Sequence, residues 1–125
     1  MIDIDNFKPI NDTFGHLFGD SILNKLGELL KTKIRETDMA ARYGGEEFAI
    51  VMSNTGLTEA VQVAERIRQS IQAFSFGTKN SLATVSIGIA MYPSDANSLN
   101  ELIEKSDNSL YKAKRDGKNR VYSYS

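Results

Sequence analysis

The sequence has 125 residues, of which 41% are hydrophobic and 25% are charged, a balance typical of one soluble globular domain. Fifteen Lys and Arg residues against sixteen Asp and Glu leave a formal charge of -1, which excludes binding of polymeric nucleic acid through a bulk positive field. No run of about 18 apolar residues indicates a membrane span, and the lack of cysteine excludes disulfides and zinc-thiolate sites. We therefore expect a cytoplasmic domain that binds any metal ion through oxygen ligands or through His16.

The first expected element is a strand over residues 1–5, where apolar and acidic side chains alternate. This alternation puts Ile2 and Ile4 on one face of the strand and Asp3 and Asp5 on the other. A domain that opens directly on a core strand is unusual, because such strands commonly follow an exposed segment. We expect the full-length protein to continue upstream of Met1, into a sensor domain or a membrane anchor.

The next expected elements are a short turn and a long helix. Residues 11–20 mix cap-forming residues with two glycines, which predicts a helical turn followed by a loop. Asp20 or Ser21 would then cap a helix that ends between Lys33 and Glu36. Its apolar residues recur every three or four positions and form one face: Ile22, Leu23, Leu26, Leu29, Leu30 and Ile34.

The middle of the chain predicts a hairpin, a helix and a strand. Residues 39–43 and 48–52 have strand-like composition, and the glycines between them readily supply the positive φ angles of a tight turn. Thr58 would cap a helix that reaches Ile71, and residues 77–80 would form a loop. Residues 83–92 alternate large apolar with small side chains, which predicts a strand suited to close packing on one face.

The last part of the chain predicts a helix and an edge strand. Ser98 and Glu101 fit a capping box, and the helix would continue to Arg115, with Gly117 ending it. Residues 121–124 would form the edge strand. A hairpin mixed with helical crossovers favours a single α+β sandwich of ferredoxin-like type, with a mostly antiparallel sheet, over a doubly wound parallel sheet.

Two acidic pairs could carry chemistry. Asp3 and Asp5 share one strand face, and paired carboxylates commonly bind Mg²⁺ together with substrate phosphates; the alternative is a solvated strand end. In residues 44–47, two glycines let the backbone approach a phosphate, while Glu46 and Glu47 would repel it unless a cation lay between them. The alternative is a simple hairpin turn with two solubilising glutamates. If the hairpin lies beside the first strand, Asp3 and Glu46 could share that cation.

Basic residues could contact phosphates, although most such residues only cover a helix end, where the helix dipole favours cations. Arg35 and Asp38, three positions apart, would by themselves form a modest surface ion pair. The lone histidine, His16, is assigned no catalytic role. The candidate phosphate contacts are Lys8, Lys112, Lys114, Arg115, Lys118 and Arg120.

Three groups of residues at separated places complete the pattern. They are Met1-Ile2-Asp3-Ile4-Asp5-x-Phe7-Lys8-x-Ile10-Asn11-Asp12-x-Phe14-Gly15-His16-x-x-Gly19-Asp20, Arg42-Tyr43-Gly44-Gly45-Glu46-Glu47-Phe48 and Leu110-Tyr111-x-Ala113-Lys114-x-x-Gly117-x-Asn119. In this order they closely resemble the GGDEF family of diguanylate cyclases, and the resemblance extends from Met1 to about Ser123.

The resemblance implies a cyclase-like α+β fold and the condensation of two GTP molecules to cyclic di-GMP, with release of two pyrophosphates. Catalysis would need a homodimer, because each active site would bind one GTP at the interface of two domains. The implied cofactor is Mg²⁺ or Mn²⁺, bound by the carboxylates of Asp3 and Glu46 and the backbone carbonyl of Ile4. Glu47 would assist deprotonation of the attacking 3′-hydroxyl.

The resemblance also implies the substrate contacts. Gly44 and Gly45 would let the hairpin approach the α- and β-phosphates, and Asn11 and Asp20 would read the guanine edge. The other phosphate contacts would come from the backbone of Phe7 and Lys8 and from the side chains of Lys114 and Lys118.

A feedback site is implied by Arg35 and Asp38, whose spacing before Gly44 matches the family's inhibitory site for cyclic di-GMP. Arg66 matches a secondary contact from a neighbouring domain. The sequence departs from the family pattern at two places. Lys118 stands where the family usually has Arg, so a planar phosphate contact becomes a point charge and the affinity for the triphosphate would be weaker. The family's opening motif Asp-x-Leu-Thr-Gly-Leu-x-Asn-Arg-Arg is absent from the sequence. They keep open the alternative of a non-catalytic module that binds GTP or cyclic di-GMP and signals to a partner.

Overall fold

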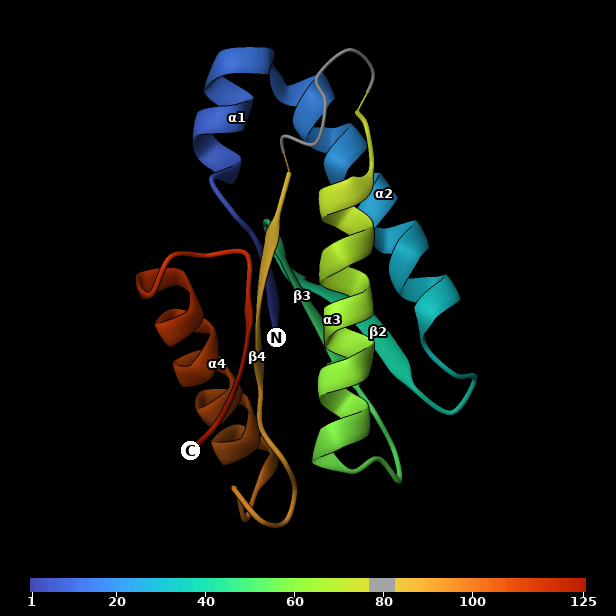
Figure 1. Cartoon of the computed structure of the whole chain (residues 1–125), viewed down its shortest axis with the longest axis vertical. Coiled ribbons are helices and arrows are strands. Elements are labelled where there is room, and N and C mark those ends of the chain that lie inside the picture. Colours follow the sequence, from blue (N-terminus) through green and yellow to red (C-terminus); the bar gives the residue numbers. More distant parts are fainter. Residues whose placement is uncertain (77–82) are drawn as a thin grey trace.

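The computed structural model describes residues 1–76 and 83–125. Figure 1 shows strands and helices interleaved along the chain, as the sequence predicts, and no helix among the described residues is long and apolar enough to cross a membrane. The elements are β1 (Ile2–Ile4), α1 (Phe7–Phe14), α2 (His16–Lys33), β2 (Met39–Gly44), β3 (Glu47–Val51), α3 (Leu57–Ala73), β4 (Val85–Ile89), α4 (Leu99–Arg115) and β5 (Val121–Ser123).

The described strands form one sheet in the order β2-β3-β1-β4-β5. β1 lies between β3 and β4 and is antiparallel to both, so that Ile2 stands opposite Phe48 on one side and Ile87 on the other. β2 and β3 form the expected hairpin, whereas β5 runs parallel to β4 at the edge. This mostly antiparallel sheet with helical crossovers confirms the ferredoxin-like α+β class.

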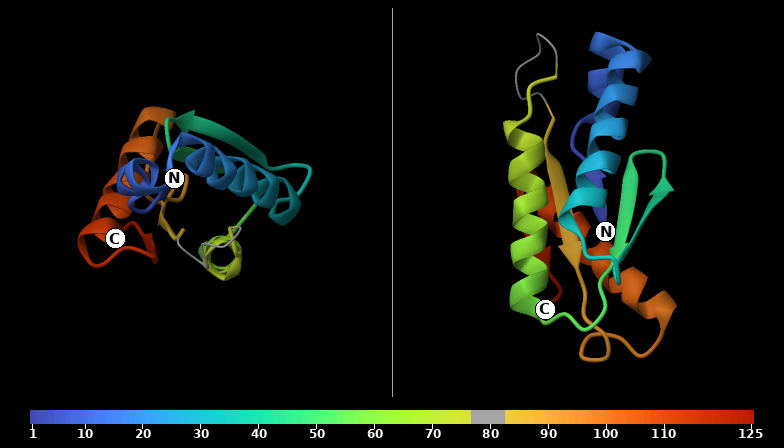
Figure 2. Two further views of the ribbon diagram at one scale, coloured as in Figure 1. Left: turned by 90° about the horizontal axis from the view of Figure 1, so that it is seen from above. Right: turned by 90° about the vertical axis from the view of Figure 1, so that its right-hand side faces the viewer.

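Helices cover both faces of the sheet (Figure 2). On one face, Ile2 and Ile4 share a hydrophobic core with Leu26 of α2 and Ile67 of α3. On the other face β4 packs directly on α4, so that a Cβ at Gly88 would lie 2.2 Å from a backbone oxygen of that helix. The small side chains of this strand therefore permit close packing, as the sequence predicts.

The turn and loop expected ahead of Asp20 are replaced by helix. α1 is followed after a single break at Gly15, where φ is 90°, by α2. The expected cap at Asp20 or Ser21 is wrong, because both residues lie inside α2. The glycine pattern misled the prediction, since Gly19 serves close packing: a Cβ there would clash with the side chain of Asn11.

The other helix boundaries test the capping predictions. The expected cap at Thr58 is wrong, because Gly56 is the N-cap of α3 and Thr58 lies in its first turn. Ser98 does cap α4: its hydroxyl accepts from the backbone N–H of Glu101. In a capping box the carboxylate of Glu101 would accept from the backbone N–H of Ser98. Here it accepts from the N–H of Asn97, one residue earlier. β4 is shorter than the expected strand, and the expected loop over 77–80 lies outside the described residues.

Candidate active site

The turn of the β2–β3 hairpin lies beside β1, the adjacency on which a shared cation site depends. Asp3 stands opposite Glu47 in the register of β1 and β3. The backbone N–H of Ile4 donates to the carbonyl of Glu46 at 3.3 Å. These pairings bring together three carboxylates, those of Asp3, Glu46 and Glu47, which we call the acidic site.

Burial raises the pKa of each carboxyl group in the acidic site above its ordinary value. For Asp3, desolvation outweighs the hydrogen bond from Lys114, which acts to lower the pKa. For Glu46 and Glu47, the negative charge of Asp3 adds to desolvation and raises the pKa further. The ionised forms of these carboxyl groups are therefore disfavoured, first by burial and then by their mutual repulsion.

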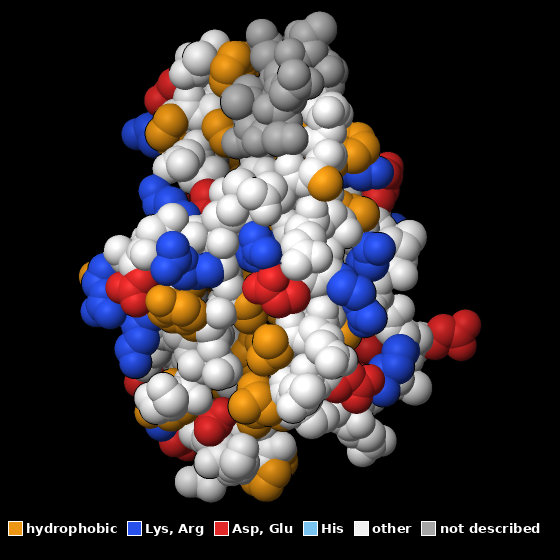
Figure 3. All heavy atoms as spheres, viewed as in Figure 1, with side chains coloured by type: hydrophobic (Ala, Val, Ile, Leu, Met, Phe, Trp, Pro, Cys, Tyr) orange, Lys and Arg blue, Asp and Glu red, His pale blue; other side chains and the backbone are white. Residues whose placement is uncertain are grey.

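Lys114, in the last turn of α4, supplies positive charge to the acidic site. Its Nζ lies 2.9 Å from Oδ1 of Asp3 and 3.7 Å from Oδ1 of Asp5. Figure 3 shows other basic side chains gathered over this part of α4, whose last turn also contains Lys112 and Arg115. A residue expected to contact phosphates is thus already within reach of the carboxylate expected to bind the cation.

Asp5 shares the strand face of Asp3 but has a structural role. Its side chain is 1% exposed and accepts hydrogen bonds from the hydroxyls of Thr84 and Ser86, each at 2.7 Å. It also accepts from the backbone N–H of Asn119 at 3.0 Å. These bonds join β1, β4 and the loop after α4. Asp5 is therefore committed to protein donors, which leaves Asp3 and Glu46 as the expected cation ligands.

The donor set of the acidic site fits a hard divalent cation. The carboxylates of Asp3 and Glu46 and the carbonyl of Ile4 are oxygen donors, which Mg²⁺ prefers. Among residues 1–76 and 83–125, no three His, Cys, Asp or Glu side chains form a metal-binding group. Mg²⁺ commonly binds through one or two carboxylates and completes its coordination with water and substrate phosphates. A small donor set of this kind is suited to an ion that is shared with a nucleotide.

The start of α1 lies close to the loop that follows α4. Asn6 adopts a left-handed conformation with φ 55°, which Asn tolerates well, and connects β1 to the helix. Its side-chain oxygen accepts from Nζ of Lys118 at 2.7 Å. Phe7 packs against the core and Lys8 is exposed. No side chain of residues 1–76 or 83–125 caps the first N–H groups of α1, so these groups are suited to bind an anion, as expected for the backbone of Phe7 and Lys8.

Asn11 has an unsatisfied polar atom. Its Oδ1 is buried and has no hydrogen-bond partner within the described part of the chain. A Cβ at Gly19 would lie 1.7 Å from this oxygen, so only glycine leaves room for the amide. Asp20, the next residue of α2 after Gly19, is exposed. A buried acceptor without a donor is costly, and a ligand N–H would remove that cost.

Arg35 and Asp38 form a compact group between α2 and β2, which we call the Arg35–Asp38 corner. The guanidinium donates from Nη2 to Oδ1 of Asp38 at 3.2 Å, and the backbone N–H of Arg35 donates to Oδ2 at 3.0 Å. Nη2 also donates to the carbonyl of Ser53 at 2.7 Å and to the hydroxyl of Thr55. Burial alone would raise the pKa of Asp38, but the bonds from Arg35 and Ser53 hold it below its ordinary value.

The structure does not join Arg66 to the Arg35–Asp38 corner. Arg66 is exposed on α3 and makes no hydrogen bond or ion pair with any described residue of the chain. Sequence reasoning also missed residues that support the site through bonds between distant segments, although the small side chain of Ser86 and the tolerance of Asn for positive φ were visible signals. The missed residues are Asn6, Ser53, Thr55, Thr84, Ser86 and Asn119.

Known proteins match this arrangement. The family model described as "Diguanylate cyclase, GGDEF domain" matches residues 1–120. "Diguanylate cyclase A" of Treponema denticola is 46% identical over 123 residues, which cover 97% of this chain and 33% of that protein. "Response regulator PleD" of Caulobacter vibrioides is 39% identical over 125 residues, which cover 97% of this chain and 28% of that protein. The chain thus spans about a third of the length of these curated relatives.

Solved structures agree with the sequence matches. The active GGEEF domain of a diguanylate cyclase from Vibrio cholerae superposes with a TM-score of 0.92 at 41% identity, over 99% of this chain and 80% of that one. The GGDEF domain of DgcB from Caulobacter crescentus, solved in complex with c-di-GMP, gives a TM-score of 0.88 at 34% identity, over 98% and 74%. The chain belongs to the GGDEF family of diguanylate cyclase domains.

Proposed function

We propose that this chain is the catalytic module of a diguanylate cyclase, which condenses two GTP molecules to cyclic di-GMP and releases two pyrophosphates. The observation that carries the proposal is the acidic site, where register brings Asp3 beside Glu46 and Glu47 and burial leaves their charge incompletely neutralised. Membership of the GGDEF family supports the same reaction. A nucleoside triphosphate that binds together with a divalent cation would supply both the positive charge that the acidic site lacks and the substrate of the reaction.

Asp3, Glu46 and the carbonyl of Ile4 would hold the cation, which we infer to be Mg²⁺ or Mn²⁺. When bound, such an ion neutralises phosphate charge and favours ionisation of an attacking hydroxyl. Gly44 and Gly45 have no side chain to separate the hairpin backbone from the α- and β-phosphates. These residues lie on β1, at the end of β2 or in the turn between β2 and β3, so the rigid sheet fixes their positions.

The remaining substrate contacts come from three separate elements. The uncapped N–H groups at Phe7 and Lys8 would bind terminal phosphate oxygens, helped by the side chains of Lys114 and Lys118. At the other end of the nucleotide, the guanine edge would donate to the buried oxygen of Asn11. The exposed carboxylate of Asp20 would accept a second guanine N–H.

The reaction joins the 3′-hydroxyl of one GTP to the α-phosphorus of another, so two domains must face each other. We infer that the active form is a homodimer in which each domain binds and orients one GTP. Glu47 would accept the proton of the attacking hydroxyl. Its raised pKa makes it a stronger base than an ordinary glutamate, which suits this role.

We also infer product inhibition at the Arg35–Asp38 corner, with Arg66 of a neighbouring domain as a further contact. The planar guanidinium of Arg35 offers a fork that suits guanine and phosphate oxygens. Arg35→Ala should raise the inhibition constant of cyclic di-GMP at least about tenfold, the loss expected for one charged hydrogen-bonding group. Arg68→Ala, which removes a basic residue of α3 bonded to Glu65 and Asn119, is the control. An inhibition constant unchanged by Arg35→Ala would contradict the proposed site.

The experiment that tests the proposed function is chromatographic detection of cyclic di-GMP. The chain is stripped of nucleotide and incubated with GTP and Mg²⁺ at concentrations that favour dimers. Product that disappears in Asp3→Asn but persists in Asp12→Asn, an exposed carboxylate of α1, would support the proposal. GTP binding without any product would favour the non-catalytic binding module instead, and absence of both binding and product would contradict the proposal.

A further inference from the structure

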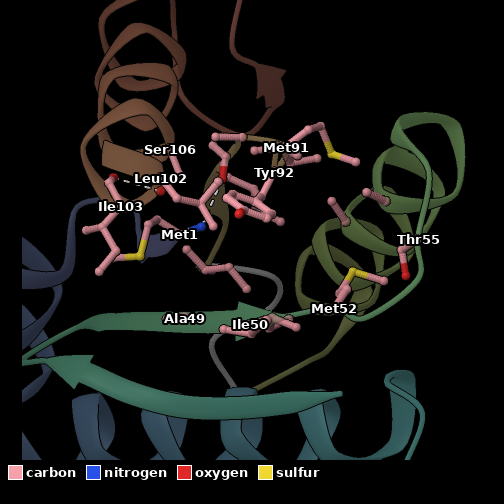
Figure 4. A pocket seen from close by; sticks show the side chains of 18 of the residues that line it. Met1, Ala49, Ile50, Met52, Thr55, Met91, Tyr92, Leu102, Ile103 and Ser106 are labelled. Carbon is pink, nitrogen blue, oxygen red and sulfur yellow. Dashed lines mark hydrogen bonds between the residues drawn. The ribbon is translucent and has the colours of Figure 1, made fainter. Parts of the chain in front are cut away.

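The two ends of β1 lie in different surroundings. At its amino end a cavity of about 930 Å³ lies beside Met1, and no Lys, Arg, Asp or Glu side chain of a described residue lines it (Figure 4). At its carboxyl end β1 passes through Asn6 directly into α1, and the loop that follows α4 lies beside that connection. Polar contacts between distant segments are therefore found at the carboxyl end of β1.

The loop after α4 has an unusual backbone conformation. The φ angles of Gly117, Lys118 and Asn119 are 126°, 63° and 48°, all in the left-handed region. Glycine adopts such angles readily and Asn tolerates them, but for a lysine they are uncommon and cost free energy. Backbone strain of this kind persists only where the surrounding structure maintains it, and it is concentrated at functional sites. Lys118 is the residue of this loop whose own preferences oppose its conformation.

Hydrogen bonds maintain the backbone of this loop. The N–H of Lys118 donates to the carbonyl of Ala113 at 2.9 Å, and the carbonyl of Lys118 accepts from Nε of Arg120, also at 2.9 Å. The next N–H, that of Asn119, donates to the carboxylate of Asp5 at 3.0 Å. The loop is thus bonded to α4 on one side and to the end of β1 on the other, which fixes the position from which the side chain of Lys118 extends.

The far end of the Lys118 side chain is held by Asn6. Nζ of Lys118 donates to Oδ1 of Asn6 at 2.7 Å, and this side chain makes no other hydrogen bond or ion pair with residues 1–76 or 83–125. An ammonium group has three N–H donors, so two remain for a ligand. A mobile lysine side chain loses rotamer entropy when it binds a ligand, and holding it in place beforehand reduces that cost. The bond to Asn6 therefore preorganises the ammonium.

Asn6 holds the ammonium without neutralising it. The amide of Asn6 carries no charge, so the positive charge of Lys118 remains available to an anion. Lys114 differs, because its Nζ lies 2.9 Å from Oδ1 of Asp3 and 3.7 Å from Oδ1 of Asp5. A cation that is held in place by a neutral group is suited to a charge-assisted hydrogen bond with a strongly charged ligand.

We propose that Asn6 is a positioning residue, which holds the ammonium of Lys118 in place for the terminal phosphates of a nucleoside triphosphate. Asn6 directly precedes Phe7 and Lys8, whose backbone N–H groups the proposed function assigns to the same phosphates. The amide acts through Lys118 and touches no substrate atom itself. It favours a triphosphate over the monophosphate with the same base. The inference rests on the nucleotide-binding part of the proposed function.

The test compares Asn6→Gly with the unchanged chain. Glycine readily adopts the left-handed conformation of Asn6, so this variant removes the amide and keeps the backbone. The matched control is Asn54→Gly, because Asn54 also has a positive φ, of 47°, and lines the cavity at the other end of β1. Titration calorimetry measures binding of 3′-deoxy-GTP with Mg²⁺, a nucleotide that lacks the attacking hydroxyl. Asn6→Gly should weaken this binding about fivefold, the loss expected for one hydrogen bond, and leave binding of 3′-deoxy-GMP unchanged. Asn54→Gly should bind both nucleotides as the unchanged chain does.

Two further variants separate positioning from a structural role. Asn6→Asp keeps an oxygen acceptor and tolerates the left-handed conformation, so a structural contact with Lys118 would survive. Its negative charge would neutralise the ammonium and repel phosphate, and it should weaken 3′-deoxy-GTP binding at least about tenfold. Lys118→Ala should weaken that binding by itself. Adding Asn6→Gly to Lys118→Ala should have no further effect, because the amide acts only through the ammonium.

Equal affinities of Asn6→Gly and the unchanged chain for 3′-deoxy-GTP would overturn the positioning role of Asn6. So would undiminished binding by Asn6→Asp, an equal loss for 3′-deoxy-GMP, or a loss that persists in the Lys118→Ala background. A chain that forms no cyclic di-GMP contradicts only the catalytic proposal, since the same titrations still decide the role of Asn6. Absence of 3′-deoxy-GTP binding to the unchanged chain would overturn both proposals.

Discussion

The Arg35–Asp38 corner and the acidic site each combine carboxylate and cationic groups, but they differ in how well the charges are neutralised. At the corner, hydrogen bonds from Arg35 and Ser53 lower the pKa of Asp38. At the acidic site, the bond from Lys114 does not offset burial, and the pKa of Asp3 is raised. The corner is therefore stable as it stands, whereas the acidic site would gain from an added cation, as the proposed function requires.

The largest effect on activity is expected from a substitution that removes a carboxylate of the acidic site. Glu46→Ala should reduce turnover of GTP by about 10³-fold, because a carboxylate of the cation site is lost and metal-ion stabilisation contributes several kcal/mol. The fold should remain, since ionised Glu46 is disfavoured by burial and by Asp3. Initial rates at saturating Mg²⁺ and circular dichroism would measure both, with Glu28→Ala on exposed α2 surface as the control. Retained turnover would reject the assignment of Glu46.

The next effect concerns the amino group of Met1, which also lies near acidic groups. Burial lowers its pKa from 8.0 to about 6, against the opposing charges of Asp107 and Glu47. The unfolded chain therefore binds more protons than the folded chain between these pH values, and stability should rise with pH across that window. A shift of this size corresponds to about 3 kcal/mol.

Amino-terminal acetylation isolates this contribution. The acetylated chain should be more stable than the free chain at pH 5.5, and the difference should disappear by pH 9. Urea unfolding of the two forms at matched pH measures the difference and cancels the titration of all other groups. A constant difference at every pH would mean that the amine is not responsible.

A smaller effect is expected when the corner is broken. Asp38→Asn should lower the free energy of unfolding by about 2 kcal/mol, because charge-assisted bonds from Arg35 and Ser53 are weakened. The folded pKa of Asp38 is lowered, so its contribution is present above the unfolded pKa and is lost as the pH falls through the folded pKa. Glu36→Gln in the same loop is the control, and equal stability of the two variants at pH 7 would contradict this account.

The smallest effect has the opposite sign. Asp3→Asn should raise the free energy of unfolding at pH 7 by less than about 1 kcal/mol, because the raised pKa of Asp3 means that its ionisation opposes folding. The gain should shrink as the pH falls through the raised folded pKa of Asp3, and it should be absent below about pH 4, where Asp3 is protonated in both states. Chemical unfolding against Asp12→Asn measures it. A loss of stability would show that the ion pair with Lys114 dominates, and the contrast with the corner would fail.

Much of the fold follows from local patterns. Apolar periodicity predicted the long helices, and the glycines before Glu46 predicted the hairpin and its turn. The expected reason was wrong, because neither Gly44 nor Gly45 has a positive φ. The interpretation of glycine as a turn residue failed at Gly19, which instead makes room for the side chain of Asn11. This is a contact between two helices, which no local pattern reveals. Gly56 likewise takes the place of Thr58 as the N-cap of α3, and it does so without a side-chain hydrogen bond.

The residues of the acidic site could be predicted from the sequence, but the incomplete neutralisation of their charge could not. The separate positions of Asp3 and Glu46 were visible, and the family resemblance joined them, whereas their adjacency depends on the register of β1 and β3. The role of Asp5 was not predictable, because its partners Thr84 and Ser86 lie about 80 positions away in the sequence. Long-range hydrogen bonds are set by the topology of the sheet and leave no local signature.

The ion pair between Lys114 and Asp3 has a consequence for the order in which ligands bind. A cation at Asp3 would compete with an ammonium group for the carboxylate, and a triphosphate would give that ammonium a new partner. Each ligand thus removes the obstacle to the other, so their affinities are thermodynamically linked, and reciprocity requires the same factor in both directions. On the proposed function, the domain would respond weakly to free Mg²⁺ and strongly to the magnesium–nucleotide complex.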